Sequence, residues 1–352
     1  MKKILGRIFT VLILPLLFIG TLNYFIDPDY VLQRNYISAL ADFLTNGKLV
    51  SGPVNVNSRA LKKQCIEKMT ENPEILVLGS SRTLSLSKKT FPGKKIYNAS
   101  VTNCTFQDMY SFLNLFDKKS KRIPETIIIC VDQWLFNDSF NEKRWLANRE
   151  DFVEMLKKTS NISEKQFPAK WELQKEWVKE LFSVRYLIRS LTKFGKTEKF
   201  EICDSVNSGK MMLLPDGSRL LSSEFIDLPE DQITKRAQHY FYSSQDEYFD
   251  VLSSFQCQLF ENLIDFMKRK QCQIILFLPP YHPAAFQLFK HSEKTTGIFK
   301  AENYIRNIAL KKQIKIIDCT DPACLNLTSA DFYDAVHLQP KKLDDIFTVL
   351  QY

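Results

Sequence analysis

The sequence lacks the residue clusters that mark a metal site. It holds four histidines in 352 residues and no Cys-x-x-Cys pair, so no side chains have the spacing of a structural zinc site. Its eight cysteines are scattered, whereas small disulfide scaffolds pack them densely. Cys130 lies in an apolar run and is expected to be buried. Cys319 and Cys324 are close enough in sequence to form a disulfide, but their spacing alone does not show whether they do. We predict neither a metal nor a cofactor.

A polybasic block is also missing. The formal net charge of +8 is spread along the chain, so nucleic acid is not an expected partner. The charge is compatible with an anionic membrane surface or an anionic glycan. There is no internal repeat, and the hydrophobic content of 45% is ordinary for a globular protein.

The first residues carry a membrane-anchor pattern. Lys2, Lys3 and Arg7 precede nineteen uncharged residues, 8–26, which is about enough for one helix to cross a bilayer core. Basic residues on that flank favour a cytoplasmic amino end. No small-x-small cleavage site precedes the Asp-Pro pair at 27–28, so we prefer an uncleaved anchor to the alternative, a cleaved signal peptide. Either choice places the body outside the cytoplasm.

Short apolar runs alternate with helical patterns along most of the chain. Such runs, bounded by turn residues, are typical of strands buried on both faces. Their alternation with helices predicts a three-layer α/β/α fold with a parallel sheet. We predict five strands, at Ile75–Leu78, 94–98, 126–131, Gln273–Leu278 and Lys315–Asp318. We predict helices at 58–70, 106–116, 298–310 and 340–352.

Residues 138–243 differ in character, because charged and aromatic residues alternate there at helical spacing. Two short runs flank the Pro-Asp-Gly sequence at 215–217, a pattern typical of a β-hairpin. After this segment, Ser244-x-x-Glu247 matches a capping box and predicts the start of a long helix. The expected organisation is an anchor (1–27), a juxtamembrane connector and helix (28–72), and a domain in two parts (73–137 and 244–352) around an inserted, mostly helical cap with a hairpin (138–243).

A Gly-Ser-Ser-Arg sequence follows the first predicted strand, at 79–82. In open α/β sheets, ligands bind at the carboxyl ends of the strands. A serine there can be held on a sharp turn with its hydroxyl exposed. The alternative is a plain strand-to-helix turn in which one serine caps the helix.

A second motif, Asp-Ala-Val-His at 334–337, lies between the fifth strand and the last helix. Its spacing lets Asp334 orient the ring of His337, which leaves the other ring nitrogen to accept a proton from a serine. The alternative is a structural histidine.

The two motifs, the five strands and the final helix together resemble the SGNH/GDSL hydrolase family. In that family, a serine after the first strand pairs with an Asp-x-x-His motif before the last helix. The resemblance spans about 73–116, 126–137 and 273–352. With its anchor, the chain looks like the membrane-tethered branch, which includes alginate O-acetyltransferase-like proteins and the D-alanyl transfer protein of teichoic acid assembly.

The resemblance implies an SGNH-hydrolase-like (flavodoxin-like) fold and three catalytic residues: Ser81 as nucleophile, His337 as general base and Asp334 as orienting carboxylate. Asn103 stands where the family has the glycine whose N–H faces the oxyanion. Gln133 is the amide nearest to the position of the family's oxyanion asparagine. Both positions depart from the family pattern, and loss of one oxyanion donor costs about a hundredfold or more in rate.

Two further residues are candidates for substrate contact. Arg82 is suited to bind an anionic substrate, or else to pair with a carboxylate near the first helix. His282 follows the fourth strand at the same sheet edge, where it either touches substrate or shapes the loop.

The function implied by the resemblance is that of an O-acyltransferase or acyl esterase outside the cytoplasm. Its substrate would be a cell-envelope glycan or an acylated carrier, and the family suggests a membrane-bound partner that delivers acyl groups. The alternative is a glycan-binding or assembly protein that keeps the fold without efficient chemistry. The departures at Asn103 and Gln133 motivate that alternative.

Overall fold

The computed structural model describes residues 9–27, 34–52, 56–120, 122–193, 200–207 and 209–349. The basic residues predicted to flank an anchor, the proline at 28 and the last three residues of the predicted final helix lie outside these ranges.

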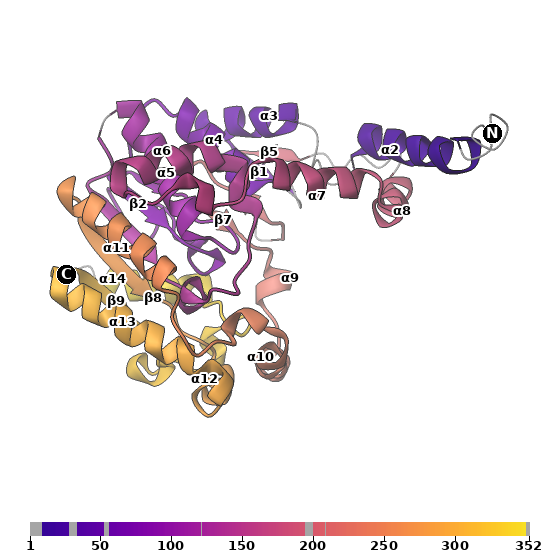
Figure 1. The fold of residues 1–352 in the computed structure, drawn as a ribbon. Coiled ribbons are helices and arrows are strands. Elements are labelled where there is room, and N and C mark those ends of the chain that lie inside the picture. Colours follow the sequence, from indigo (N-terminus) through magenta and orange to yellow (C-terminus); the bar gives the residue numbers. More distant parts are fainter. Residues whose placement is uncertain are drawn as a thin grey trace.

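A five-stranded parallel sheet forms the centre of the body (Figure 1). The pairs β2–β3, β2–β4, β4–β8 and β8–β9 are all parallel, and the spatial order is β3-β2-β4-β8-β9. The predicted α/β class with five strands is therefore confirmed, and three predicted strands have the observed bounds. The strands are β2 (Ile75–Leu78), β3 (Ile96–Asn98), β4 (Thr126–Cys130), β8 (Gln273–Leu278) and β9 (Lys315–Asp318).

Alternate strand residues face two separate apolar cores, as the two-residue period of a strand requires. Leu76 and Ile129 join the larger core, whereas Val77 and Ile128 join the smaller one. The larger core includes residues of α4 (Ser58–Lys68), α5 (Phe106–Ser120), α11 (Ser254–Arg269) and α13 (Thr296–Lys312). The smaller core includes residues of α14 (Pro340–Val349).

The direction of strand addition reverses between β2 and β4. The chain goes from β2 to its neighbour β3, then returns to the other side of β2 and continues outward. At such a switch point the loops after two adjacent strands diverge and leave a crevice for a ligand. The strand ends approach closely here, since a Cβ at Gly79 would lie 2.4 Å from the Cβ of Cys130. Only glycine fits at this position without a shift of the backbone.

A second sheet joins the insertion to the segment before the first parallel strand. The predicted hairpin around 215–217 is confirmed as the antiparallel pair β6–β7. This hairpin extends an antiparallel sheet of order β5-β1-β6-β7, which the sequence analysis did not predict. Its strands are β1 (Leu49–Ser51), β5 (Glu201–Cys203), β6 (Met212–Leu213) and β7 (Arg219–Leu220).

The other helices lie before β2, between β4 and β8, and between β8 and β9. Before the sheet lies α3 (Arg34–Thr45). Those between β4 and β8 are α6 (Arg149–Thr159), α7 (Trp171–Leu181), α8 (Val184–Lys193), α9 (Ser223–Ile226) and α10 (Glu230–Ser243), in addition to α11. Between β8 and β9 lies α12 (Pro283–Lys290), in addition to α13.

The capping box predicted at 244–247 is wrong. Glu247 ends a short 3-10 turn and is fully buried, while α11 begins only at Ser254. The cap of α11 is Ser253, whose hydroxyl accepts a hydrogen bond from the N–H of Gln256 (3.3 Å). The carboxylate of Glu247 instead points into the protein, where it accepts a hydrogen bond from the hydroxyl of Tyr281 (2.8 Å) and lies 3.7 Å from the guanidinium of Arg82.

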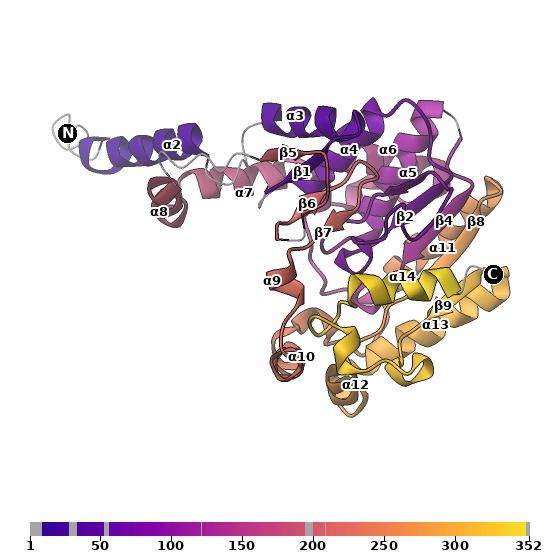
Figure 2. The same ribbon diagram turned by 180° about the vertical axis from the view of Figure 1, so that it is seen from behind.

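The N-terminal helix projects from the body together with two helices of the insertion. It consists of a π-helical stretch (Phe9–Ile13) and α2 (Leu14–Ile26), and it lies beside α8 in both views (Figures 1 and 2). Across the ranges that the structure describes, no helix has the length and apolar character needed to cross a membrane. All eight cysteines fall within those ranges and are free, including Cys319 and Cys324.

Candidate active site

Ser81 opens a 3-10 turn directly after β2. Ser80 caps this turn, because its hydroxyl accepts a hydrogen bond from the N–H of Arg82 (3.3 Å). The buried amide of Asn98, at the end of the neighbouring strand, donates to the carbonyls of Thr83 (2.7 Å) and Leu86 (2.9 Å). Two strand ends therefore fix the backbone of the turn, so that Ser81 has a defined position at the switch point.

The Asp-Ala-Val-His motif lies on a loop that is closed on itself. An antiparallel bridge joins Phe332 to Leu338, and the N–H of Tyr333 donates to the carbonyl of His337 (3.1 Å). The ring of Tyr333 also stacks on the imidazole of His337, with ring centroids 5.2 Å apart and planes at 5°. The bridge, the hydrogen bond and the stacked ring of Tyr333 thus hold the imidazole in place independently of its contact with Ser81.

The structure brings Ser81, His337 and Asp334 together in hydrogen-bonding order. Nε2 of His337 lies 2.8 Å from Oγ of Ser81, and Nδ1 lies 2.7 Å from Oδ2 of Asp334. The other carboxylate oxygen accepts hydrogen bonds from the N–H groups of Val336 and His337, each at 2.9 Å. A serine, a base and an orienting carboxylate in this order can carry out nucleophilic catalysis.

Asp334 is held in its charged form. Burial alone would raise the pKa of this carboxyl, but the adjacent imidazole and the two N–H donors outweigh it, so the pKa lies below its ordinary value. The nearby Asp331 is engaged elsewhere. It accepts a hydrogen bond from the N–H of Thr328 (2.7 Å) and pairs with Lys342 (3.2 Å).

Arg82, the residue after Ser81, is buried in the protein interior. Its guanidinium lies between the rings of Trp134 and Tyr281, at 4.6 Å and 4.5 Å from their centroids. Its nitrogens approach two buried carboxylates, Asp132 (3.3 Å) and Glu247 (3.7 Å), without forming an aligned hydrogen bond to any described residue. With a side-chain exposure of 1%, Arg82 does not reach solvent. The structure therefore shows the carboxylate-pairing role of the two that the sequence allowed.

The carboxylates around Arg82 hold their protons unusually tightly. Burial raises the pKa of Asp132 to about 6 and that of Glu247 to about 7, although the guanidinium opposes both shifts. For Arg82, burial favours the neutral form, but Tyr281, Asp132 and Glu247 outweigh it and raise the pKa. A charged arginine thus lies beside two carboxyls that titrate near neutral pH.

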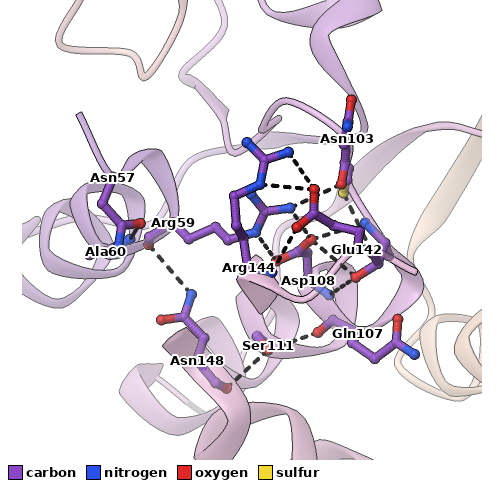
Figure 3. Close-up of polar contacts among 12 residues, drawn as sticks. Asn57, Arg59, Ala60, Asn103, Gln107, Asp108, Ser111, Glu142, Arg144 and Asn148 are labelled. Atoms are coloured by element: carbon purple, nitrogen blue, oxygen red, sulfur yellow. Dashed lines mark hydrogen bonds and ion pairs between the residues drawn. The ribbon is translucent and has the colours of Figure 1, made fainter. Parts of the chain in front are cut away.

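The backbone of Asn103 has a left-handed conformation. Its φ of 49° lies in the left-handed region, where glycine is favoured and asparagine is among the few tolerated residues. The carbonyl of Asn103 accepts a hydrogen bond from Nη2 of Arg59 (3.0 Å), which reaches over from α4 (Figure 3). Arg59 in turn forms a two-pronged ion pair with Asp108 of α5, at 2.7 Å and 2.8 Å. This buried pair fixes the turn at the end of the neighbouring strand.

Among the backbone N–H groups near this edge that have no acceptor in the described part of the chain are those of Ser81, after β2, and of Asn103, in the loop after the adjacent strand β3. Unpaired N–H groups at such positions are the donors that stabilise an oxyanion.

Gln133 and His282 are both fully buried. The Oε1 of Gln133 lies 3.2 Å from the hydroxyl of Tyr281, so this amide contacts the residues around Arg82. His282 caps α12, since its Nδ1 accepts from the N–H of Ala284 (3.1 Å). Burial lowers the pKa of His282 to about 4, against the opposing effect of Asp334. His282 is therefore neutral, and its observed contact is the loop-shaping one.

A cavity of about 70 Å³ lies beside the serine turn. Its wall includes Leu84, one residue past the 3-10 turn, and Arg219 of the insertion hairpin. A buried lysine, Lys62, hydrogen-bonds the carbonyls of Asn98 and Gly217 at this wall. Burial lowers the pKa of Lys62 to about 8. Most of the other lining is apolar, including Leu61, Tyr97, Leu213 and Leu214.

A comparison with family sequence profiles gives one match. Residues 56–351 match the family described as "Protein of unknown function (DUF1574)". The chain belongs to this family. The matched region contains Ser81, Asp334 and His337, so this site lies within the DUF1574 region. A search of curated proteins finds no match.

The sequence analysis missed three residues that hold this DUF1574 site in place. Glu247 was predicted to belong to a helix cap and Arg59 to lie in the helix at 58–70, and no role was predicted for Tyr281. Each acts through a partner more than 30 positions away: Glu247 and Tyr281 contact Arg82, and Arg59 contacts Asp108. The one local signal was the presence of Tyr281 at the carboxyl end of a buried strand, next to His282.

Proposed function

We propose that this protein is a serine-dependent acyl-transfer enzyme, either an O-acyltransferase or an acyl esterase. The observation that carries the proposal is the contact between Oγ of Ser81 and Nε2 of His337 at 2.8 Å, with Nδ1 bound to a charged Asp334. The proposal includes an SGNH-hydrolase-like, three-layer form of the α/β fold. The strand order and the serine at the switch point support it.

The reaction would proceed in two steps. In the first, Oγ of Ser81 attacks an acyl carbonyl while Nε2 of His337 takes the hydroxyl proton. The proton then passes to the departing alkoxide, which leaves an acyl-Ser81 ester. In the second step, His337 deprotonates a sugar hydroxyl or water, which attacks the ester and regenerates the serine. Asp334 stabilises the imidazolium in both steps, and the N–H groups of Ser81 and Asn103 are the proposed oxyanion donors.

The proposed substrate is an acyl group on a cell-envelope glycan or acylated carrier. This substrate class is proposed on the family resemblance, since the cavity beside Leu84 is lined by neither Ser81 nor His337. Action outside the cytoplasm, anchored at the N-terminus, is also a proposal. It rests on the order of basic and then apolar residues at 2–26. An acyl-delivering membrane partner is proposed on the family resemblance alone.

The full chain in detergent, incubated with p-nitrophenyl acetate, tests the chemistry. Ser81→Ala is expected to lower the rate at least about a thousandfold, since the nucleophile is lost. Ser139→Ala, which removes an exposed serine hydroxyl, is the matched control. A fluorophosphonate probe should label Ser81 in the wild type and not in His337→Ala. Equal hydrolysis by wild type and Ser81→Ala would reject the enzyme.

One observation favours a second candidate, a glycan-binding or assembly protein without efficient chemistry. The side-chain Nε2 of Gln133, the amide expected as an oxyanion donor, is buried and lies out of reach of solvent. This candidate predicts that envelope polysaccharide binds equally well to the wild type and to Ser81→Ala. It also predicts that Ser81→Ala restores glycan acylation in a deletion strain, whereas the enzyme proposal predicts that it does not.

A further inference from the structure

The interface between α2 and α8 is polar at its centre. Asn23 is fully buried there; its amide donates to the carbonyl of Leu181 (2.7 Å) and accepts from the hydroxyl of Ser190 (3.0 Å). One turn further along α2, the hydroxyl of Tyr186 donates to the carboxylate of Asp27 (2.8 Å). We call α2, α7 and α8 the arm, because they project together from the body (Figure 2).

A small residue lets the arm helices approach closely. A Cβ at Gly20 would lie 2.7 Å from the ring of Phe182, so the ring rests directly on the backbone of α2. The buried positions of α2 are Gly20 and Asn23. None of the large apolar side chains of this helix is buried in the contact.

Large apolar side chains cover the outside of the arm. On α8, Val184, Ile188 and Leu191 recur at helical spacing and are each more than half exposed. The described part of the chain has few comparable side chains elsewhere, and those are scattered over the body. The exposed large apolar residues of the arm and the π-helical stretch before it are Val11, Ile13, Leu14, Leu16, Leu17, Phe18, Tyr24, Phe25, Trp171, Val178, Phe182, Val184, Ile188 and Leu191.

This arrangement is the reverse of a helix pair that is stable in water. In water, apolar stripes pack together and polar residues face outward. In hydrocarbon, polar groups must find partners inside the assembly, and small residues permit close packing of helices. The contact between α2 and α8 has polar and small residues at its centre, and the exposed surface of both helices carries most of the large apolar side chains. On α7, the exposed apolar residues Trp171 and Val178 lie among exposed charged ones. The outer surface of α2 and α8 is therefore suited to an apolar surrounding.

The charges of α8 all have one sign. The helix carries Arg185, Arg189 and Lys193 and no acidic residue. Arg185 and Arg189 are exposed and follow directly after the apolar Val184 and Ile188. An amphipathic helix with apolar and basic exposed residues is typical of binding at the surface of an anionic bilayer.

We propose that the arm is a lipid-binding element. The outer surfaces of α2 and α8, together with Trp171 and Val178 of α7, contact the apolar layer of a bilayer that contains anionic lipid, and the arginines of α8 face the lipid phosphates. This inference does not rest on the proposed function. It assigns lipid contact to a part of the insertion, at 171–193, for which the sequence analysis expected only a helical cap.

Trp171 provides a native probe, since it is 49% exposed on α7, whereas Trp134 and Trp145 are buried and Trp177, on the same helix, is only partly exposed. The full chain is reconstituted into vesicles of phosphatidylcholine and phosphatidylglycerol with brominated acyl chains, which quench tryptophan within the apolar layer. We expect quenching in the wild type and loss of the greater part of it in Trp171→Phe. Trp145→Phe, the matched control in the core, should retain it. Equal quenching in wild type and Trp171→Phe would overturn the proposal.

Two further variants separate the apolar from the electrostatic contribution. Ile188→Asp should weaken the quenching of Trp171, whereas Val251→Asp, at a site 69% exposed on the body, should not. The double variant Arg185→Glu/Arg189→Glu should lose the increase in quenching that phosphatidylglycerol produces over phosphatidylcholine alone. No such loss would contradict the anionic-lipid part of the proposal.

A second copy of the chain is the competing occupant of this surface. Arm-to-arm cross-links together with an unquenched Trp171 would show that a protein interface covers the arm, and would reject lipid contact. The result is independent of catalysis. Ser81→Ala should be quenched like the wild type, and Trp171→Phe should still hydrolyse a soluble ester if the proposed enzyme activity is present.

Discussion

The guanidinium of Arg82 lies 3.7 Å from the carboxylate of Glu247, which comes from the far side of the insertion. The residue after the proposed nucleophile is therefore paired with a segment 165 positions away in sequence. Because both groups are buried, water does not readily solvate the charge that remains when one partner is removed. The position of the serine turn thus depends on an ion pair that takes no part in the chemistry.

This pair predicts a stability loss that depends on pH. The pKa values of Asp132 and Glu247 are raised in the folded protein, to about 6 and about 7. Protonation of these carboxyls therefore stabilises the fold. The contribution is fully present below about pH 4, the pKa range of the unfolded chain, and is lost as the pH rises through 6 to 7. Arg82→Met removes the compensating charge, so the expected loss at pH 8 is about 3–5 kcal/mol. At pH 5 the loss should be smaller, because Asp132 and Glu247 are then largely protonated and leave no unpaired negative charge when Arg82 is removed.

Denaturant unfolding at pH 5 and pH 8 measures this difference. Arg144→Met, at an exposed arginine paired with Glu142, is the control and should change little at either pH. The same loss for Arg82→Met at both pH values would contradict the assignment of Asp132 and Glu247 as the titrating partners.

The orienting role of Asp334 predicts a large effect on rate with little effect on folding. Asp334→Asn keeps the shape of the side chain but cannot stabilise the imidazolium, so kcat/KM for an acyl ester should fall by about 10³–10⁴. Asp331→Asn is the matched control, because Asp331 contacts Thr328 and Lys342 instead of His337. Equal rates in the two variants would show that Asp334 does not orient the base.

The left-handed backbone of Asn103 predicts opposite effects for two substitutions. Asn103→Gly should be neutral or stabilise the fold, because glycine adopts a φ of 49° without strain. Asn103→Val should destabilise it by about 1–3 kcal/mol, because a branched side chain is strained there. If the N–H of Asn103 binds the oxyanion, Asn103→Gly should also retain the esterase rate. Thermal unfolding and ester hydrolysis of both variants test this.

The close approach at Gly79 predicts that even alanine is not tolerated there. Its Cβ would lie 2.4 Å from the Cβ of Cys130, so one of the two strand ends must move, at a cost of about 1–3 kcal/mol. Gly209→Ala, where the nearest group is the side chain of Asn207 at 3.3 Å, should cost far less. Cys130→Gly should partly rescue Gly79→Ala. If Cys130→Gly did not restore stability to Gly79→Ala, the destabilisation would not come from contact with the Cβ of Cys130.

The parallel sheet could be predicted from sequence because its signal is local. In the runs Ile75–Leu78 and Gln273–Leu278, every residue except the exposed Gln273 is apolar and buried, so both strands stand out in the sequence. The grouping of Ser81 with His337 follows from the same property, since the carboxyl ends of parallel strands share one edge.

What could not be predicted depends on contacts between distant segments. Strand β1 has three residues, too few for a period, and its partners lie in the insertion. Glu247 fits a capping box in sequence, but its carboxylate turns inward to accept hydrogen bonds from the hydroxyls of Tyr281 (2.8 Å) and Tyr240 (3.3 Å), beside Arg82. The pair Arg59–Asp108 likewise joins two helices whose relative position no local pattern encodes.

The turn of the β6–β7 hairpin is tied to the loops around the serine at three points. The N–H of Arg219 donates to the carbonyl of Leu84 (2.8 Å), and the N–H of Asn98 donates to the carbonyl of Asp216 (2.7 Å). The carboxylate of Asp216 also accepts a hydrogen bond from the N–H of Lys88 (2.8 Å). Opening this hairpin would break all three bonds at once, so it forms a fixed wall of the cavity and not a lid. The cavity beside Leu84 would then keep a constant size, so any molecule that enters it has to fit a preformed space.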